Sequence, residues 1–292
     1  MNNLQANYER ILEVLRKISG ENLLSYQRRV PKLKDLELII VVLTAKFMGI
    51  DSENHLFRHI PDTLGQKIDR SEYNRRKRRL ASKINEIRMK LARSFNEHEK
   101  FFIIDSMPIE VCKLSRSHTS KIFKDAEYCY PNRGFCASQQ MHFYGYKLHA
   151  VCSISGIFQS IDLSPASVHD IHYLKDIKEQ LSDCTLIGDK GYLSSEIQID
   201  LFNYANIELE TPKRVNQKDY RPQFYLFKKQ RKKIETLFSQ LCDQFMIKRN
   251  YAKSFEGFKT RILAKITALT VVQFINKAYF KRNINNLKVS II

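Results

Sequence analysis

The stretch that decides the fold reads Phe101-Phe102-Ile103-Ile104-Asp105, and a second stretch of the same kind reads Cys184-Thr185-Leu186-Ile187-Gly188-Asp189. Each is a short apolar run that ends in an aspartate. Such a run predicts a central strand buried on both faces, with the aspartate emerging at the strand's end. Carboxylates at the ends of neighbouring strands meet in the cleft where α/β sheets bind ligands. The two stretches therefore predict an α/β fold with two aspartates at one edge of its sheet.

The sequence between and after these stretches alternates between strands and helices. Residues 144–152 and 157–163 predict two strands joined by the tight link Ser153-Ile154-Ser155-Gly156, which is typical of a hairpin. The further expected elements are a helix at 169–181, a strand at 207–210, a helix from about 225 to 245 and a packing helix at 258–280. This order predicts a mixed sheet flanked by helices.

The first hundred residues predict helices only. Leu36 to Met48 reads as a buried helix, and a sharper amphipathic helix is expected to begin at Ser71 as its N-cap. The first turns of that helix carry the cations Arg75, Arg76, Arg78 and Arg79. A helix-turn-helix-like module could lay such a helix in a major groove of DNA, although a solvated basic face is the common alternative. We expect a helical DNA-binding region at 1–98 and a catalytic domain with C-terminal helices at 99–292.

The charge of the chain indicates a polyanionic partner. Its 292 residues include 49 Lys and Arg against 31 Asp and Glu, a net charge of +18. A strongly basic domain gains free energy on binding nucleic acid because counterions leave the phosphates. The alternative is a basic protein that its charge merely keeps in solution.

Other function classes find no support in the sequence. No apolar run has the roughly 18–20 residues that a membrane helix needs, and the N-terminus lacks the layout of a signal peptide. No glycine-rich phosphate loop is present, so ATP is not expected. We expect a cytoplasmic protein associated with the nucleoid.

A third carboxylate, Glu235, lies on the helix expected at 225–245. It falls at the rim of an apolar stripe, and Arg231 lies one turn before it. An ordinary Arg231–Glu235 helix pair would explain both residues if they stood alone. Together with Asp105 and Asp189, however, Glu235 completes a set of hard oxygen ligands. Mg²⁺ or Mn²⁺ prefers such ligands, and two such ions about 3.5–4 Å apart serve phosphoryl displacement.

Four segments of the chain resemble a known family. They are Ile104-Asp105-Ser106-Met107-Pro108, Tyr144-Gly145-Tyr146-Lys147-Leu148-His149, Ile187-Gly188-Asp189-Lys190-Gly191-Tyr192 and the run from Arg231 to Leu241. These segments are similar to those of bacterial insertion-sequence transposases of the DDE class. The insertion sequence 982 family is the nearest group. The resemblance implies an RNase H-like, retroviral-integrase-like catalytic fold.

The resemblance also implies roles for individual residues. Asp105, Asp189 and Glu235 would be the catalytic residues and the ligands of Mg²⁺ or Mn²⁺, with two ions expected. Arg231 matches an arginine that related transposases place four residues before the glutamate. The same signature has a tyrosine and a lysine where this chain has Lys228 and Cys242, so that part is absent or displaced.

Further cations are candidates for DNA contact. Lys147, His169 and Lys190 lie in or beside the matching segments. Lys147 could equally be a solvent-facing strand residue, and His169 could equally begin a helix. The polar stretch Lys113–Gln140 carries Arg116 and Arg133, and also Lys121 and Lys124. It is long enough to be a functional loop.

The resemblance implies a DNA transposase that binds the terminal inverted repeats of its element. Water would cut the strand to expose a 3′-hydroxyl, which would then attack target DNA. Because two element ends must be brought together, a homodimer is expected. Two alternatives stay open: an RNase H-fold nuclease or resolvase that cuts without strand transfer, and a catalytically inactive DNA-binding relic.

Overall fold

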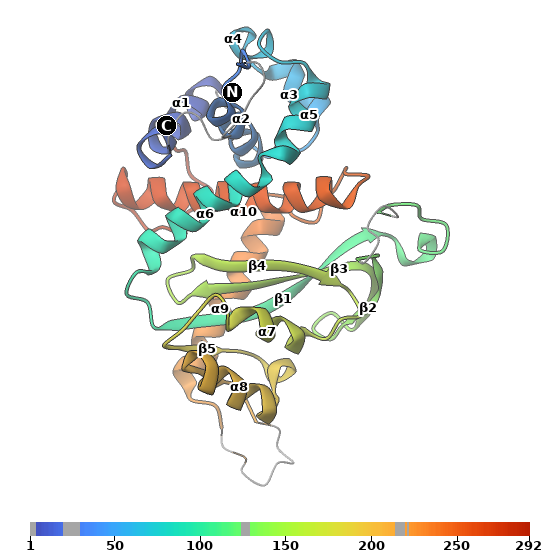
Figure 1. Cartoon of the computed structure of the whole chain (residues 1–292), viewed down its shortest axis with the longest axis vertical. Coiled ribbons are helices and arrows are strands. Elements are labelled where there is room, and N and C mark those ends of the chain that lie inside the picture. Colours follow the sequence, from blue (N-terminus) through green and yellow to red (C-terminus); the bar gives the residue numbers. More distant parts are fainter. Residues whose placement is uncertain (1–3, 20–29, 124–128, 214–219, 221) are drawn as a thin grey trace. The chain divides into compact units, whose positions relative to one another are not determined.

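The computed structural model describes residues 4–19, 30–123, 129–213, 220 and 222–292. The chain divides into two compact units. One is made of Met1–Ser94 with Gln240–Ile292, and the other is Phe95–Ser239 (Figure 1). Two distant segments thus build the first unit, whereas the second is continuous. Among the described residues, no helix combines the length and apolar character that crossing a membrane requires.

The first unit is helical. Its helices are α1 (Leu4–Ile18), α2 (Asp35–Phe47), α3 (Glu53–His59), α4 (Asp62–Gly65), α5 (Arg70–Arg79), most of α6 (Ala81–Asn96) and α10 (Phe255–Ala278). The apolar helix α2 is buried almost throughout and packs against α1 and α10. The prediction of a buried helix at 36–48 is therefore confirmed.

Buried charges tie the two segments of the helical unit together. Lys265 of α10 is 1% exposed, and its Nζ donates to Asp51 Oδ2 at 2.9 Å and to the carbonyls of Met246 and Arg249 at 2.7 and 3.0 Å. Lys46 of α2 donates to the other oxygen of Asp51 at 2.7 Å. Breaking such a buried pair by removing one partner destabilises strongly, because the remaining charge loses its compensation.

The basic helix predicted from Ser71 differs in two respects. It is two helices, α5 and α6, with Leu80 between them in a non-helical conformation. Its N-cap is Asp69, whose Oδ1 accepts from the Glu72 amide at 2.8 Å. The prediction of Ser71 was wrong because an aspartate two residues earlier also satisfies the free amides of the first turn.

The second unit contains a six-stranded mixed sheet. Its strands are β1 (Phe101–Cys112), β2 (Asn132–Cys136), β3 (Met141–Ser153), β4 (Phe158–Pro165), β5 (Cys184–Ile187) and β6 (Ile207–Glu210). The order is β2-β3-β1-β5-β6, with β4 also paired to β3. The β1–β3 and β3–β4 pairs are antiparallel, whereas β1–β5 and β5–β6 are parallel. The predicted hairpin at 144–163 and the predicted mixed sheet are confirmed.

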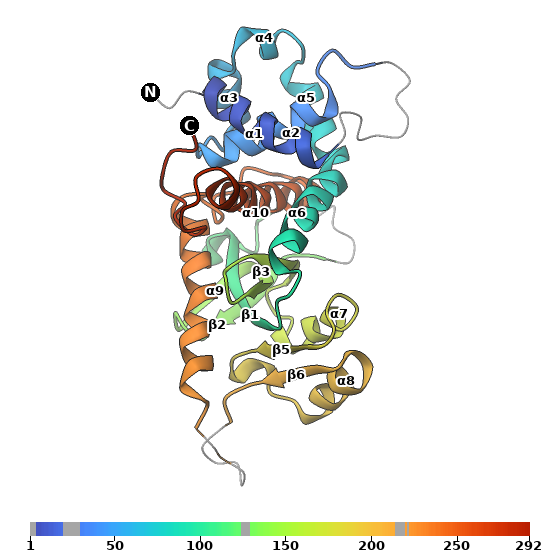
Figure 2. The same cartoon turned by 90° about the vertical axis from the view of Figure 1, so that its left-hand side faces the viewer.

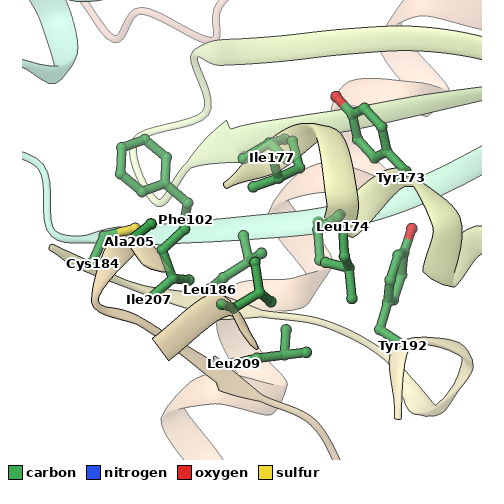
Figure 3. Close-up of a cluster of buried hydrophobic side chains, with 13 residues drawn as sticks. Phe102, Tyr173, Leu174, Ile177, Cys184, Leu186, Tyr192, Ala205, Ile207 and Leu209 are labelled. Carbon is green, nitrogen blue, oxygen red and sulfur yellow. The ribbon is translucent and has the colours of Figure 1, made fainter. Parts of the chain in front are cut away.

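Helices flank both faces of this sheet. Figure 2 shows α9 (Tyr225–Asp243) along one side of the strands, with α7 (Leu174–Ile177) and α8 (Ser195–Ala205) along the other. The short 3-10 turns are η1 (Leu114–Arg116), η2 (Asp170–Tyr173) and η3 (Lys190–Tyr192). An apolar cluster on the α7 and α8 side joins β1, β5 and β6 to these helices (Figure 3). On the other side, the ring of Phe238 in α9 stacks on Phe158 of β4, with centroids 6.3 Å apart.

Three local predictions are corrected by the structure. β1 does not end at Asp105 but continues to Cys112, because its second half pairs with β3 alone. The helix expected at 169–181 is limited to η2 and α7, which together end at Ile177. The stretch Lys113–Gln140, expected to be irregular, includes η1 and β2. Within that stretch, residues 124–128, and so Lys124, lie outside the described residues.

Candidate active site

The strand register brings Asp105 and Asp189 to corresponding positions. The parallel pairing of β1 with β5 ends at Ile103 opposite Ile187. Each aspartate comes two residues after its paired isoleucine, where the two strands stop being hydrogen-bonded. The prediction that β1 itself ends at Asp105 was wrong, yet the pairing with β5 does end just before it. The two side chains therefore stand at the opening between the strands.

The turn after β5 orients Asp189. Its Oδ1 accepts from the Gly191 amide at 2.7 Å and caps η3. A Cβ added at Gly191 would lie 2.9 Å from Asp189 Oδ1, so a side chain there would press on the carboxylate. Asp105 has a similar local contact, because its Oδ1 accepts from the Ser106 amide at 2.8 Å. Each aspartate is thus oriented through one oxygen.

Helix α9 supplies the third carboxylate. Ile234 and Leu237 are buried, whereas Glu235 is exposed and Arg231, one turn earlier, is partly exposed. No Arg231–Glu235 ion pair forms among the described residues, so the ordinary helix pair that could explain both is not present. Instead, the charges of Glu235 and Arg231 both act on Asp105.

Asp105 interacts electrostatically with both of the other carboxylates, so the three lie near one another. Burial is the largest cause that raises the pKa of Asp105, to about 7. The negative charges of Asp189 and Glu235 raise it further, while the Ser106 amide and Arg231 lower it. Carboxylates that share a site disfavour one another's ionisation unless a cation offsets them.

Whether the three carboxylates could hold a metal ion depends on how close together they lie. In the described part of the chain, no group of three or more His, Cys, Asp or Glu side chains is close enough together to hold a metal ion. The chemistry of Asp105, Asp189 and Glu235 nevertheless suits a divalent cation. Burial, and after it the negative charges of the other two carboxylates, raise the pKa of Asp105, and hard oxygens are the ligands that Mg²⁺ and Mn²⁺ prefer. A metal would thus fit this set only after at least one carboxylate moves closer.

Comparison with protein families identifies the domain that contains the sheet. A family model described as the transposase DDE domain matches residues 96–271. The chain belongs to this transposase family. The match contains Asp105, Asp189 and Glu235, and the expected RNase H-like mixed sheet is confirmed. A comparison with curated proteins found no match.

A buried tyrosine next to the transposase's aspartates was missed by sequence reasoning. Tyr192 is 1% exposed, and its hydroxyl has no hydrogen-bond partner among the described residues. Burial raises its pKa well above the ordinary value, and the charges of Asp170, Asp105 and Asp189 add to this. Figure 3 shows its ring at one end of the apolar cluster. The Lys190-Gly191-Tyr192 motif was the available signal, but it did not reveal that the hydroxyl is buried.

A second missed group surrounds Lys147 of the transposase. Its Nζ lies 3.0 Å from Asp170 Oδ1 and donates to the Val168 carbonyl at 2.9 Å. The buried His149 lies beside them, with Nε2 2.7 Å from Ser164 Oγ. Burial lowers the pKa of His149 to about 4, so this ring is neutral at pH 7. Lys147 is therefore held internally and does not extend into solvent.

The other cations predicted to contact DNA are placed in different ways. Arg116, Arg133 and Lys190 are exposed in the unit that contains the sheet, as are Arg75, Arg78 and Arg79 in the helical unit. His169 is exposed and caps η2, with Nδ1 accepting from the Ile171 amide at 3.3 Å. Arg76 is only 8% exposed, and its guanidinium binds Asp35 Oδ1 at 2.6 Å and the Leu33 carbonyl at 2.8 Å. These contacts leave Arg76 no access to a phosphate.

Proposed function

We propose that this transposase binds the terminal inverted repeats of its element and uses Asp105, Asp189 and Glu235 to cleave and join DNA strands. The observation that carries the proposal is that the charges of Asp189 and Glu235 both act on the buried Asp105, so the three carboxylates are neighbours. Their place after the β1–β5 pairing and on α9 supports it, because ligands bind where parallel strands open.

Asp105, Asp189 and Glu235 would hold Mg²⁺ or Mn²⁺. Two such ions supply positive charge at the attacking and leaving oxygens of an in-line phosphoryl displacement. The protein's own part is to orient the carboxylates, and the contacts with the Ser106 and Gly191 amides support that role for the two aspartates. Glu235 is free to move towards the two aspartates once a cation offsets their repulsion, since its side chain is exposed and has no ion-pair partner among the described residues.

The cations around the carboxylates would bind the scissile strand. Arg231 acts on Asp105 with its positive charge and would contact a phosphate oxygen. Exposed Lys190, Arg116 and Arg133 would add phosphate contacts. His169 would donate from Nε2, because Nδ1 accepts a backbone hydrogen bond and the proton of the neutral ring then lies on Nε2.

Two displacements follow from this arrangement. In the first, a water oxygen forms a bond to phosphorus while the bond to the 3′-oxygen breaks and a 3′-hydroxyl is released. In the second, that 3′-oxygen forms a bond to a target phosphorus while the target's own 3′-oxygen leaves. Because two element ends take part, we propose that a homodimer acts. The insertion sequence 982 subgroup stays part of this proposal.

The test is cleavage and joining of labelled element-end DNA with Mg²⁺ or Mn²⁺. We expect metal-dependent joined products from the wild type and none from Asp189→Asn or Glu235→Gln. Asp176→Asn is the matched control, since it neutralises an exposed carboxylate of α7 in the same unit. Cleavage without joining would identify a nuclease or resolvase instead. DNA binding with neither reaction would identify an inactive relic.

A further inference from the structure

The helical unit contains an open cleft with an excess of positive charge. Its volume is about 990 Å³, and it lies between the start of α3, one face of α5 and the segment that leads into α10. Its cations are Arg70, Arg75, Arg78 and Lys253, and the ring of Tyr251, 57% exposed, lies among them. We refer to these five residues as the basic cleft.

The acidic side chains that line the cleft do not balance its cations. Glu53 pairs with Lys77 at 2.8 Å and with Arg261, neither of which is among the cations of the cleft. Asp69 Oδ1 accepts the capping hydrogen bond from the Glu72 amide, and its carboxylate keeps its charge. The lining therefore has four cations and one carboxylate without an ion-pair partner among the described residues.

The cations, in contrast, are largely uncommitted. Among the described residues, Arg70, Arg78 and Lys253 form no ion pair, and Arg75 pairs only with Glu72 on its own helix. A surface pair of that kind contributes little and exchanges readily. The cleft thus presents several positive charges that an anionic ligand could use.

The neutral side chains of the cleft also suit phosphate. Ser71, Asn74 and Asn54 lie beside the cations and offer hydroxyl and amide donors. Arg, Lys, Ser, Asn and Tyr side chains together are the usual donors to the phosphate oxygens of DNA. The composition therefore fits a nucleic-acid backbone better than a small apolar ligand.

The shape of the cleft argues against base reading by α5. Arg70, Asn74 and Arg78 recur every four residues and share one face of the helix. That face lines the cleft, flanked by α3 and by Tyr251 and Lys253, instead of forming a free ridge. A recognition helix has to enter a major groove with its own side chains leading. The flanking residues instead favour contact with a backbone.

We propose that the basic cleft binds the sugar–phosphate backbone of DNA without reading its base sequence. This proposal rests on the proposed function only in the choice of DNA as the polyanion. It adds Arg70, Lys253 and the aromatic ring of Tyr251 to the DNA-contacting residues predicted from the sequence. It also assigns Arg75 and Arg78 to the backbone, away from the major groove expected for them.

The test uses the full-length protein in EDTA, so that binding is separated from strand cleavage. The variant Arg70→Gln/Arg78→Gln/Lys253→Gln is compared with Arg58→Gln/Arg93→Gln/Lys259→Gln. The control removes three exposed cations of the same unit that lie outside the cleft. Fluorescence anisotropy gives Kd for two duplexes of unrelated sequence and for a single strand, over a range of salt concentrations.

We expect the cleft variant to raise Kd about tenfold or more on both duplexes, and to reduce the slope of log K against log salt by about 0.9 for each lost contact. The control should change Kd by less than about threefold, since screening weakens distant exposed charges. Unchanged thermal midpoints would show that both variants fold. Equal effects of the two variants would overturn the proposal, because net charge alone would then explain binding.

A charge-retaining variant tests the absence of base reading. Arg70→Lys/Arg78→Lys keeps the point charges and should change the affinity for both duplexes by the same factor. The loss of a bidentate phosphate contact acts on every sequence, whereas the loss of a bidentate base contact acts on one. A loss on one sequence alone would overturn the proposal. The variant Tyr251→Ala distinguishes single-stranded from duplex DNA as the ligand. A loss of affinity for the single strand alone assigns the cleft to unpaired DNA with a base stacked on Tyr251. An equal loss of affinity for all three DNAs assigns it to duplex DNA.

Two further outcomes distinguish failure of the cleft proposal from failure of the proposed function. If the wild type joins DNA and the cleft variant binds it equally well, only the cleft proposal fails. If the wild type binds no DNA, the proposed function fails too. Tighter binding of a poly-glutamate peptide than of DNA, lost in the same cleft variant, would reassign the cleft to an acidic protein segment and overturn the proposal.

Discussion

At the scale of single residues, the most informative side chain is Asp105. It is an acid whose protonated form is favoured in the folded protein, because burial and the charges of Asp189 and Glu235 penalise ionisation. The pKa is about 7 in the folded protein, against an ordinary value of 3.8. Without a metal, the folded state therefore keeps a proton that the unfolded chain has already lost.

The sign of the resulting pH dependence follows from proton linkage. Between about pH 4 and pH 7 the folded state binds more protons than the unfolded state, so the free energy of unfolding falls as pH rises. The variant Asp105→Asn has no carboxyl group at this position, so it lacks this pH dependence of the free energy of unfolding. In EDTA at pH 8 we expect the variant to be more stable than the wild type by at most about 4 kcal/mol. At pH 4 the two should be nearly equal.

Urea denaturation at pH 4 and pH 8 measures this difference. Asp176→Asn, which removes an exposed carboxylate of α7 in the same unit, is the control. A stability gain from Asp105→Asn that is the same at both pH values would contradict the assignment of the raised pKa to this residue.

At the scale of elements, α5 uses its cations for two purposes. One face lines the basic cleft, while Arg76 and Lys77 point inward and are buried. Arg76 binds Asp35, at the start of α2, and the neighbouring Leu33 carbonyl. The helix is thus fixed to the unit by one arginine and is free to bind a ligand through others.

Replacing Arg76 should therefore affect folding more than DNA affinity. We expect Arg76→Met to lower the free energy of unfolding by about 3–5 kcal/mol, because Asp35 loses a buried cation. Arg78→Met, on the exposed face of the same helix, should change it by less than about 0.5 kcal/mol. Chemical denaturation measures both. An Arg76→Met protein as stable as Arg78→Met would contradict the structural role.

The elements also indicate why sequence reasoning succeeded in some places and failed in others. The apolar runs at 101–104 and 184–187 and the 153–156 turn act locally, so the sheet and its hairpin could be predicted. The second half of β1 includes Pro108 and Glu110 and has no apolar run, yet it pairs with β3. Met107, Ile109 and Val111 do alternate with polar residues there, but the proline between them argued against a strand, and the partner strand lies about forty residues away.

Prediction of the site was limited in the same way. Asp105, Asp189 and Glu235 could be proposed as a set because each follows a local pattern and the family resemblance joins them. The burial of Arg76 could not be predicted, since it depends on a contact with Asp35, 41 residues earlier. Tyr192 was missed for a similar reason: its burial follows from packing among β1, β5 and α8.

At the scale of the whole molecule, the helical unit is discontinuous in sequence. The expected boundary at residue 98 and the first structural boundary after Ser94 are close, but Gln240–Ile292 belongs with the N-terminal helices. α10 packs on α2 and α5, and its Lys265 and Arg261 pair with Asp51 and Glu53. Half of the buried charge compensation therefore comes from the second segment.

A fragment of residues 1–94 should consequently not fold alone. We expect it to lack a cooperative thermal transition by circular dichroism and to be digested rapidly by trypsin. Co-expression with a 240–292 fragment should restore both properties, because it returns α10 and Lys265. A cooperative transition for 1–94 by itself would contradict this prediction, and the fragment 95–239 serves as the control that should fold independently.

The discontinuity of the helical unit has a consequence for synthesis on the ribosome. A chain emerges from its N-terminus onwards, at about 5–20 residues per second. The helices up to Ser94 lack part of their core while the whole β-sheet is translated. They can pack against α10 only after residues 240–292 have been made. The basic cleft, which needs Tyr251 and Lys253, is completed at that late stage. A chain interrupted before residue 251 would thus lack the basic cleft, and a newly made protein would complete this cleft only after its β-sheet unit has been made.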